Sequence, residues 1–393
     1  MNWRTVQIKD ICKKVTSGGT PLTSKENYYF PRQIPWVKTK EVNYCRITDA
    51  ETYISQEGLD NSSAKLIPAN SVIVAMYGQG DTAGRVAINK IPVATNQACC
   101  NLIIDETKAD YRFIYYKLST MYEKLVSLKN GGAQPNLNVA IIKNLEVNIP
   151  NLEIQHNIAD ILSAYDDLIE NNQKQIKLLE EAAQRLYKEW FVDLRFPGCE
   201  YTPIIDGVPQ GWKRERLVDI ADVVMGQSPK SEFYNQNSEG LPFHQGVGSY
   251  GPRFVFDDTY STSYTRIALE GSILFSVRAP VGRLNITKNR IVIGRGLSAI
   301  NHKNKHQSYL FYMLKERFFE DNLIGNGSIF ASISKDELLN QVFLVPKLEC
   351  EERFNIIVSS IDRQIEVLDE RIKRLTEARD RLLPKLMSGE LEV

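Results

Sequence analysis

The 393-residue sequence lacks the short motifs by which many nucleotide-using enzymes are recognised. It contains no Gly-Lys dipeptide, which excludes a phosphate-binding P-loop, because that loop requires a lysine directly after its last glycine. It also contains no Pro-Pro dipeptide, which excludes the Asn/Asp-Pro-Pro-aromatic motif with which amino-methyltransferases hold a flipped base. We therefore expect neither nucleotide hydrolysis nor methyl transfer from this chain.

Long apolar runs and paired cysteines are absent as well. No run is long enough to span a bilayer, and the opening Met1-Asn2-Trp3-Arg4 lacks the apolar core of a signal peptide, so we expect a soluble, cytoplasmic protein without membrane contact. The six cysteines show no metal-ligand spacing, which predicts reduced thiols and no zinc site. They are Cys12, Cys45, Cys99, Cys100, Cys199 and Cys350.

Net charge is absent too, with 48 basic and 48 acidic residues, and this balance does not favour nucleic acid as a partner. The charges are unevenly placed, however. Residues 152–193 contain nine acidic and four basic side chains, so the remainder of the chain is correspondingly more basic. A surface that faces DNA is therefore still possible outside this acidic segment.

Two short patterns resemble ligand sites only superficially. Residues 78–84, Gly-Gln-Gly-Asp-Thr-Ala-Gly, suggest a dinucleotide loop, but the third glycine comes one residue late, and a tight turn is the better interpretation. His302 and His306 have the i, i+4 spacing of helical metal ligands. The lysines and asparagine between them suit a solvated turn better, and no carboxylate accompanies them in that stretch, so we predict no metal site.

An internal duplication determines the predicted architecture. Residues 150–153 match residues 346–349 at an offset of 346 − 150 = 196, and the match continues without a gap to Arg381-Leu382. Upstream, two further pairs of segments correspond at shifting offsets: Gly84-Arg85-Val86 with Gly282-Arg283-Leu284, and residues 113–116 with residues 309–312. The sequence therefore predicts a variable unit, a constant helix, a second variable unit and a second constant helix.

Both constant segments carry the apolar stripe of a coiled coil, at alternating intervals of four and three residues. The residues that we expect to pair the helices are Ile158, Leu162, Ile169, Ile176, Leu179, Leu186, Val358, Ile365, Ile372, Leu375 and Leu382. Two stripes in one chain can bury each other, and an antiparallel pair is the simplest arrangement. Asn172 is interpreted as a register device within the first stripe, and Pro384 predicts an end or a kink near Leu383.

The variable units are predicted to mix strands with helices. Short apolar or alternating runs predict strands, and aromatic residues at helical spacing predict helices with core-facing aromatic stripes. The expected strands are residues 71–76, 145–149, 271–276 and 343–345, and the expected helices are residues 110–124 and 306–319. The predicted fold class is α+β (mixed α/β), with two pseudo-repeated globular domains joined by two long helices that form an antiparallel coiled coil.

Loops of both variable units are rich in side chains that could read DNA. Arg and Lys pair with guanine and Asn or Gln with adenine in the major groove, while other lysines neutralise phosphates. The candidate DNA-contacting residues are Lys38, Lys40, Gln79, Arg85, Gln97, Gln134, Asn136, Gln245, Arg278, Arg283 and Arg295. Arg85 and Arg283 occur in both repeats, so a structural salt bridge is the stronger alternative for them. The unit-specific candidates that we favour for sequence choice are Lys38, Lys40, Gln79, Arg278 and Arg295.

Stretches that border the helices resemble the specificity subunits of type I restriction-modification systems. One comprises residues 186–198, Leu-Tyr-Lys-Glu-Trp-Phe-Val-Asp-Leu-Arg-Phe-Pro-Gly, and the other residues 382–393, Leu-Leu-Pro-Lys-Leu-Met-Ser-Gly-Glu-Leu-Glu-Val. Pro346-Lys347-Leu348-Glu349 also fits, whereas the first helix has Asn151 where that family often has a second proline. No family motif covers the variable units, so the resemblance implies no particular target sequence.

The resemblance implies a non-catalytic subunit with two target-recognition domains, residues 1–150 and 197–346, each reading one half of an asymmetric bipartite site in double-stranded DNA. The conserved helical spacers, residues 151–196 and 347–393, would set the distance between the half-sites and dock two methyltransferase subunits. S-adenosylmethionine, ATP and Mg would be bound by the methyltransferase and restriction subunits, and this chain itself would bind no cofactor.

Two other classes of protein remain open on the sequence. A non-enzymatic scaffold could bind protein or carbohydrate through its two lobes, with the helices as a spacer. A self-sufficient modification enzyme would methylate DNA without partners. The dependence of DNA binding on salt separates the first class from a DNA reader, and methyl transfer by the isolated chain identifies the second.

Overall fold

The computed structural model describes residues 3–130, 135–318 and 332–393. The chain divides into two compact units. Unit 1 comprises Met1–Asn171 and Arg371–Val393, and unit 2 comprises Asn172–Glu370. Each unit thus combines one variable domain with parts of both long helices. Among the described residues, no helix combines the length and apolar character needed to cross a membrane.

Unit 1 is built on a mixed five-stranded sheet. The strands of the unit are β1 (Arg4–Gln7), β2 (Cys12–Ser17), β3 (Ile34–Val37), β4 (Cys45–Ile47), β5 (Tyr53–Ile54), β6 (Val72–Ala75), β7 (Val86–Asn89), β8 (Ala94–Thr95), β9 (Cys99–Ile104) and β10 (Glu146–Ile149). The five-stranded sheet has the order β2-β9-β6-β7-β4, with β4 parallel to β7. A smaller sheet has the order β5-β3-β8, and β1 pairs with β10. The expected strands 71–76 and 145–149 are therefore confirmed as β6 and β10.

Short helices pack around the sheets of unit 1. They are α1 (Gln56–Asp60), α2 (Tyr111–Ser119), α3 (Tyr122–Ser127) and α4 (Val139–Lys143), with single turns at Ile8–Ile11, Glu26–Tyr28 and Thr39–Glu41. Asp110 begins α2, because its carboxylate accepts from the backbone N–H of Arg112 at 2.7 Å. The helix expected over 110–124 is thus two helices, separated at Thr120 and Met121. The aromatic stripe at 113–116 is buried, as predicted.

Unit 2 repeats this architecture. Its strands are β11 (Ile204–Ile205), β12 (Val208–Pro209), β13 (Lys213–Arg216), β14 (Ala221–Met225), β15 (Tyr234–Asn235), β16 (Leu241–His244), β17 (Tyr260–Ser261), β18 (Ile267–Ala268), β19 (Ile273–Ser276), β20 (Leu284–Ile286), β21 (Ile291–Ile293), β22 (Leu297–His302) and β23 (Val342–Val345). Its helices are α6 (Leu217–Ile220), α7 (Gln307–Phe318) and α9 (Lys335–Leu339), with short turns at Lys188–Val192, Cys199–Tyr201, Ser231–Phe233 and Val247–Ser249. The expected strands 271–276 and 343–345 are confirmed as β19 and β23.

The strand order shows that the duplication extends through the variable units. The sheet β14-β22-β19-β20 of unit 2 corresponds to β2-β9-β6-β7 of unit 1. The parallel pair β16 and β21 corresponds to β3 and β8, and β13 with β23 corresponds to β1 with β10. The two variable units therefore share one topology, although their sequences align only loosely.

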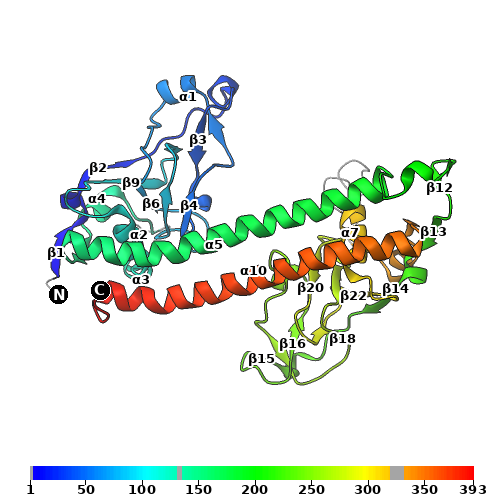
Figure 1. The fold of residues 1–393 in the computed structure, drawn as a ribbon. Helices are drawn as coiled ribbons and strands as arrows, with labels where there is room; N and C mark the ends of the chain where they lie inside the picture. The colour runs from blue at the N-terminus through cyan, green and yellow to red at the C-terminus, as the bar shows by residue number, and fades with distance from the viewer. Residues whose placement is uncertain (1–2, 131–134, 319–331) are drawn as a thin grey trace. The chain divides into compact units, whose positions relative to one another are not determined.

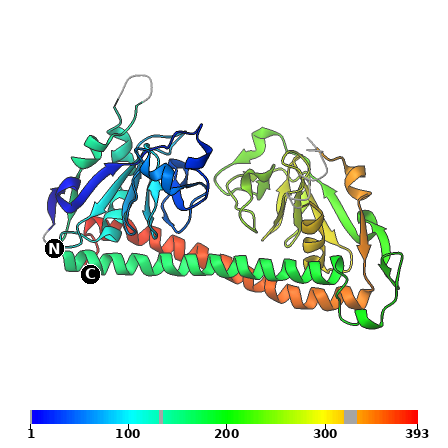
Figure 2. The same ribbon diagram turned by 90° about the horizontal axis from the view of Figure 1, so that it is seen from above.

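Two long helices, α5 (Leu152–Tyr187) and α10 (Leu348–Ser388), contribute to both units. Each is drawn as an unbroken coil in Figure 1 and in Figure 2. In unit 1, Arg379 of α10 contacts Asp166 of α5 at 2.7 Å. In unit 2, the ring centroid of Tyr187 of α5 lies 5.8 Å from that of Phe354 of α10. In unit 1 the C-terminal part of α10 thus meets the N-terminal half of α5, and in unit 2 the N-terminal end of α10 meets the C-terminal end of α5. The helices are therefore antiparallel, as predicted.

The apolar stripes of these helices face the cores of the units. All eleven residues named above as helix-pairing are buried or half-buried. Ile158 and Leu162 belong to the core cluster of unit 1, which α2 also joins, and Leu382 packs against it. Val358 belongs to the core cluster of unit 2, and Leu186 packs against it. The stripe thus packs on the domains as well as on the partner helix; the pairing roles of the individual residues remain predictions.

Of the two outcomes predicted for Pro384, an end of the helix near Leu383 is wrong, because α10 continues through Pro384 to Ser388. A proline inside a helix removes one hydrogen bond and costs about 3 kcal/mol. Leu386 and Met387 follow it and are buried in the core of unit 1. The burial of these two side chains offsets the lost hydrogen bond, so the last turn of the helix is retained.

Candidate nucleic-acid interface

In unit 1, four loops meet where the parallel strands β3 and β8 end. Because parallel strands share a direction, Lys38 after β3 and Asn96 after β8 emerge at one edge. The N–H of Asn96 donates to the Val37 carbonyl at 3.0 Å, and the N–H of Gly19 donates to the Thr95 carbonyl at 2.9 Å. We call residues 18–20, 38–40, 76–79 and 96–98 the loop edge of unit 1.

The corresponding loops of unit 2 are held by equivalent hydrogen bonds. The N–H of Gly294 donates to the His244 carbonyl at 2.8 Å, and the N–H of Gln227 donates to the Ile293 carbonyl at 2.9 Å. Val277, at the end of the neighbouring hairpin strand, donates to the Gly296 carbonyl at 2.9 Å. We call residues 226–228, 245–247, 277–278 and 294–296 the loop edge of unit 2.

One glycine in each loop edge is required by close backbone contact. A Cβ on Gly18 would lie 2.1 Å from the Thr95 carbonyl oxygen, and a Cβ on Gly226 would lie 2.1 Å from the Gly294 carbonyl oxygen. Both distances are far below a permitted contact, so only glycine fits at these places. In each unit, the glycine allows the segment that follows β2 or β14 to pass directly against the backbone at the end of β8 or β21.

Most candidate residues of unit 1 belong to its loop edge. Gln79 and Gln97 are exposed, and Gln97 accepts a hydrogen bond from the Thr20 hydroxyl. Lys40 is exposed and paired with Glu51. The Lys38 ammonium is half-buried, 5.2 Å from the centroid of the indole of Trp36. These side chains supply amide groups and cations at a single edge, which are the groups that read base edges and neutralise phosphates.

The remaining candidates of unit 1 lie elsewhere. Arg85 donates to Asp81 at 2.6 Å and to Asn43 at 2.9 Å, which favours the structural alternative. Asn136 is half-buried, and its N–H donates to the Asn130 carbonyl at 3.0 Å. Gln134 lies outside the described residues.

In unit 2, the loop edge collects Gln245, Arg278 and Arg295, all of which are exposed. The N–H of Arg295 donates to the Ser228 hydroxyl at 3.2 Å, which ties this loop to the glycine loop. Arg283 is exposed and directly precedes β20, the strand that pairs with β19. Its carbonyl accepts from the N–H of Ser276 of β19 at 3.0 Å. The edge therefore carries two exposed guanidinium groups and an amide.

Thr20 was missed by the sequence analysis. The signal was present, because Ser17-Gly18-Gly19-Thr20 occupies the same place after β2 as Met225-Gly226-Gln227-Ser228 after β14. The two segments share only one residue at matching positions, so the correspondence becomes visible only when the strand order is known.

Comparison with known families agrees with this arrangement. A family model described as the type I restriction modification DNA specificity domain matches residues 1–181 and 209–377, well over half of the chain. The chain belongs to this family. It is a type I specificity subunit with two target-recognition domains, a DNA-recognition subunit and not a catalytic one. The resemblance and the fold class predicted from the sequence are thereby confirmed.

Individual relatives match the whole chain or part of it. The specificity subunit is 29% identical over 412 aligned residues to the Type I restriction enzyme MjaIX specificity subunit of Methanocaldococcus jannaschii, covering 100% of this chain and 94% of the relative. It is 28% identical over 182 residues to the EcoR124I/EcoR124II specificity subunit of Escherichia coli, covering 46% and 45% of the two chains. The crystal structure of the S subunit of a type I system from M. genitalium matches with a TM-score of 0.63 at 18% identity, covering 98% and 96%, and supports the fold.

A histidine cluster of this specificity subunit lies away from its loop edges. His302 ends β22, His306 precedes α7 and Glu351 lies on α10, with their ligand atoms all within 4.8 Å of one another. His302 is buried, so the solvated turn expected here is wrong for this residue, although Lys303 and Lys305 are exposed. The sequence could not show this, because Glu351 is remote along the chain and reaches the histidines only after folding.

The hydrogen bonds of the cluster do not fit a metal site. His302 Nδ1 accepts from the N–H of Asn304 at 3.1 Å and from the N–H of His306 at 3.4 Å. The proton of the neutral ring must therefore lie on Nε2, which is 3.3 Å from Glu351 Oε1. A metal would need a bare Nε2, since Nδ1 already accepts these backbone donors. The cluster is better described as a neutral His302 that lies beside a buried carboxylate, Glu351, whose hydrogen bond is made with His306 Nδ1 at 2.5 Å.

Acid should destabilise unit 2 through His302. Burial, with a smaller contribution from His306, lowers the pKa of His302 from 6.5 to about 4. The unfolded chain then binds more protons than the folded chain between these values. Stability should therefore fall as pH drops from 6.5 to 4, by about 3 kcal/mol in total. Urea unfolding of the wild type and of His302→Asn at several pH values measures this difference.

His302→Asn is a suitable control because the asparagine oxygen can accept the same backbone N–H groups without titrating. Burial raises the pKa of Glu351, which has the opposite dependence on pH but is present in both proteins. The stability of the wild type should decrease relative to the variant as pH falls. Equal pH slopes for the two proteins would show that His302 does not titrate in this way.

Proposed function

We propose that the specificity subunit reads a split DNA site, one half with the loop edge of unit 1 and the other half with the loop edge of unit 2. The observation that carries the proposal is the duplication of this edge on one topology. Equivalent backbone hydrogen bonds hold each edge, while the side chains that it presents differ. A reader for two unlike half-sites needs this combination of a common frame and different contacts.

The helices are proposed to set the spacer between the half-sites. Helix α5 has 36 residues and α10 has 41, and each contributes residues to both units. At about 1.5 Å rise per residue such helices are more than long enough to cover one DNA turn of about 34 Å. This length supports the helices as the element that fixes the distance between the two reading edges.

The outer faces of the helices are proposed to dock two methyltransferase subunits. Leu168 and Leu178 of α5 and Ile356 and Val367 of α10 are exposed, although they lie on the helices and not in loops. Exposed large apolar side chains on a regular element favour a protein partner over DNA. S-adenosylmethionine, ATP and Mg would then be bound by methyltransferase and restriction subunits, consistent with the missing P-loop and Pro-Pro motifs of this chain.

An exchange of one reader tests the proposal. Replacing residues 1–150 by the corresponding domain of another specificity subunit should change one half of the methylated site and leave the other half and the spacer unchanged. The complex of the chimaera with its methyltransferase partner is assayed by mapping methylated adenines in genomic DNA. A change in both halves would show that the two units do not read independently.

Two further measurements separate the alternatives. Sequence-specific DNA binding should weaken steeply with rising salt, because each phosphate contact releases counterions, whereas a protein-binding or carbohydrate-binding scaffold shows no such dependence. The isolated chain, incubated with DNA and labelled S-adenosylmethionine, should transfer no methyl group. Transfer by the chain alone would identify a self-sufficient modification enzyme.

A further inference from the structure

A buried arginine of unit 2 connects the target-recognition domain to helix α10. The Arg253 side chain is 3% exposed, and its Nη2 donates to Asp362 Oδ1 at 2.6 Å. Its Nη1 lies 3.6 Å from Glu180 Oε1 of α5, and its Cζ lies 3.6 Å from the ring centroid of Phe311. The Tyr312 hydroxyl donates to the same oxygen of Asp362 at 3.0 Å. Asp362 therefore accepts from two side chains of the domain.

Unit 1 contains an equivalent arrangement. The Arg46 side chain is 10% exposed and is paired with Asp167, with Glu170 at 3.6 Å and with Asp166 at 3.8 Å, all of α5. The Tyr116 hydroxyl donates to Asp166 Oδ2 at 2.5 Å. An arginine and a tyrosine of the domain thus meet the same aspartate of the helix in both units.

The aspartate and the tyrosine follow the internal repeat. Asp362 and Asp166 are separated by 362 − 166 = 196 residues, and Tyr312 and Tyr116 by 312 − 116 = 196. This is the offset at which the helices themselves match. The helix and the domain helix that packs on it have therefore kept their mutual register in both copies.

The arginines do not follow that offset, since 253 − 46 = 207. They nevertheless occupy the same place in the fold. Arg46 lies on β4 and pairs in parallel with Ile88 of β7. The Arg253 carbonyl accepts from the N–H of Ile286 of β20, and its neighbour Phe254 forms a parallel bridge to the same residue. Because β7 and β20 are equivalent strands, the variable sequence brings a cation to the same carboxylate from the same sheet edge.

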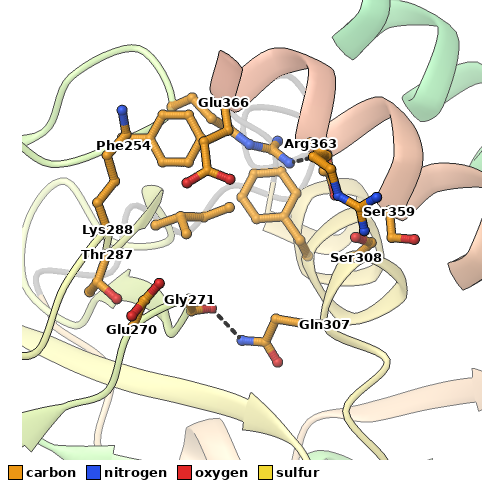
Figure 3. A pocket seen from close by; sticks show the side chains of 14 residues that line it. Phe254, Glu270, Gly271, Thr287, Lys288, Gln307, Ser308, Ser359, Arg363 and Glu366 are labelled. Atoms are coloured by element: carbon orange, nitrogen blue, oxygen red, sulfur yellow. Dashed lines mark hydrogen bonds and ion pairs between the residues drawn. The ribbon is translucent and has the colours of Figure 1, made fainter. Parts of the chain in front are cut away.

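Packing alone does not fill the junction between this domain and α10. A cavity of about 260 Å³ lies beside Arg253. In Figure 3, Phe254 and Lys288 of the domain border it on one side, and Ser359 and Arg363 of α10 border it on the other. The elements on the two sides of this cavity do not pack against each other at that place. Specific polar contacts beside this cavity therefore act together with the apolar core in setting the direction of the domain on its helices.

Lys288 makes a second ionic contact across this junction, 2.6 Å from Asp369. Both partners are partly exposed, so solvent and salt weaken their attraction. The Arg253 pair is almost fully buried and uses a planar guanidinium, which fixes the direction of approach as well as the distance. Buried pairs of this kind contribute little net stability, and their best-attested use is to fix one arrangement of packed elements.

We propose that Arg46 and Arg253 are positioning residues that set the angle at which each target-recognition domain sits on its helices. The Arg-Asp-Tyr cluster comprises Arg46, Asp166 and Tyr116 in unit 1 and Arg253, Asp362 and Tyr312 in unit 2. The inference rests on the proposed reading of a split site, because the angle of each domain then fixes the permitted spacing of the half-sites. The cluster acts on the spacing and not on the bases that each loop edge reads.

The two clusters differ in the cations that surround the shared aspartate. Asp166 also accepts from Arg379 of α10 at 2.7 Å, whereas the residue that corresponds to Arg379 in unit 2, at 379 − 196 = 183, is Ala183. Loss of Arg46 therefore leaves Asp166 with a second cation. Loss of Arg253 leaves Asp362 without an arginine partner, and the charge of Lys315 then acts on Asp362 and Glu180 in place of a direct pair. Unit 2 should therefore be the more sensitive of the two.

The test uses the full chain in complex with its methyltransferase partner and a DNA library in which the half-sites are separated by spacers of varied length. Arg253→Met should raise methylation at spacers one base pair too long or too short by about fivefold relative to the native spacer, and Arg46→Met by less. The base preferences within each half-site should not change. Arg290→Met, at an exposed arginine of the same domain, should leave the spacer profile unaltered.

Tyr312→Phe keeps the ring and removes only the hydroxyl donor to Asp362, so it tests the cluster even if Arg253→Met fails to fold. It should broaden the spacer profile in the same direction with a smaller amplitude. Folded variants with the wild-type spacer profile, or variants that lose base preference while keeping the spacer, would overturn the proposal.

A measurement without DNA separates this inference from the proposed function. Spin labels introduced as unnatural amino acids at the exposed positions 264, on the domain, and 356, on α10, report the distance between them. Arg253→Met should broaden the distance distribution, and Arg290→Met should not. An unchanged distribution in a folded Arg253→Met protein would contradict the cluster's role. If the complex of the wild type with its methyltransferase partner methylated an undivided site, the proposed function would fail, while the label distances would still decide the role of the cluster.

Discussion

Replacing Phe354 with alanine is expected to lower the free energy of unfolding of unit 2 by about 3–5 kcal/mol. Phe354 is fully buried, and its ring centroid lies 5.0 Å from that of Phe191, 5.8 Å from that of Trp190 and 6.2 Å from that of Tyr309. These rings come from the start of α10, from the turn Lys188–Val192 that follows α5, and from α7. Truncation leaves a cavity where both long helices meet the domain, and rigid surrounding rings cannot collapse into it.

Hydrogen exchange followed by mass spectrometry measures this loss separately for each unit. Amides of unit 2 should exchange much faster in Phe354→Ala than in the wild type, whereas amides of the core of unit 1, which Phe354 does not touch, should change little. Ile356→Ala is the matched control, since Ile356 lies on the same helix but is exposed. An equal effect of both substitutions, or an effect confined to unit 1, would show that Phe354 is not a core residue of unit 2.

The periodic features of this chain could be predicted from its sequence. A stripe at intervals of four and three residues has one stable solution, a helix with that face covered, and the gap-free offset of 196 residues requires two copies of it. The strand runs at 71–76 and 271–276 were equally clear, because Val72-Ile73-Val74-Ala75 and Ile273-Leu274-Phe275 are apolar and partly β-branched. In each case a local pattern and the global fold require the same structure.

Features that depend on residues remote in sequence could not be predicted. The arginines of the two Arg-Asp-Tyr clusters are separated by 207 residues and their aspartates by 196, so no single alignment brings both into register. His302 was expected in a solvated turn, because its neighbours are lysines and an asparagine, yet Glu351 from α10 covers it. Local composition predicts solvent exposure only when no distant element packs over the segment.

The positions of the candidate DNA-contacting residues could be predicted only in part, because they too depend on residues remote in the sequence. Side-chain chemistry alone points to Lys38, Gln97, Gln245 and Arg295, and the parallel strand pairs bring these residues to the loop edges. Arg85 has equal chemistry, but Asp81 and Asn43 occupy its donors. Donor groups in a sequence thus indicate what a loop can bind, whereas their availability depends on partners that only the fold supplies.

Removing both guanidinium groups from the loop edge of unit 2 should relax one half-site and leave the other intact. Arg278 and Arg295 are the exposed arginines at this edge, brought together by the hydrogen bond from Val277 to Gly296. A bidentate contact from arginine to guanine contributes about 1–3 kcal/mol of discrimination, so the double variant Arg278→Ala/Arg295→Ala should lose about tenfold or more in preference at the affected bases. The complex with its methyltransferase partner is assayed on a library randomised in both half-sites.

Arg290→Ala provides the control for this experiment. Arg290 is exposed and precedes β21, whereas Arg295 follows that strand, so the two arginines lie at opposite ends of one element. Each substitution removes one positive charge from the same domain, so the double variant should lose more non-specific attraction to DNA than Arg290→Ala. Only substitutions at the loop edge should alter base preference. If Arg290→Ala relaxes the same half-site, or if the double variant weakens binding uniformly across all sequences, these arginines contact phosphates and the bases are read elsewhere.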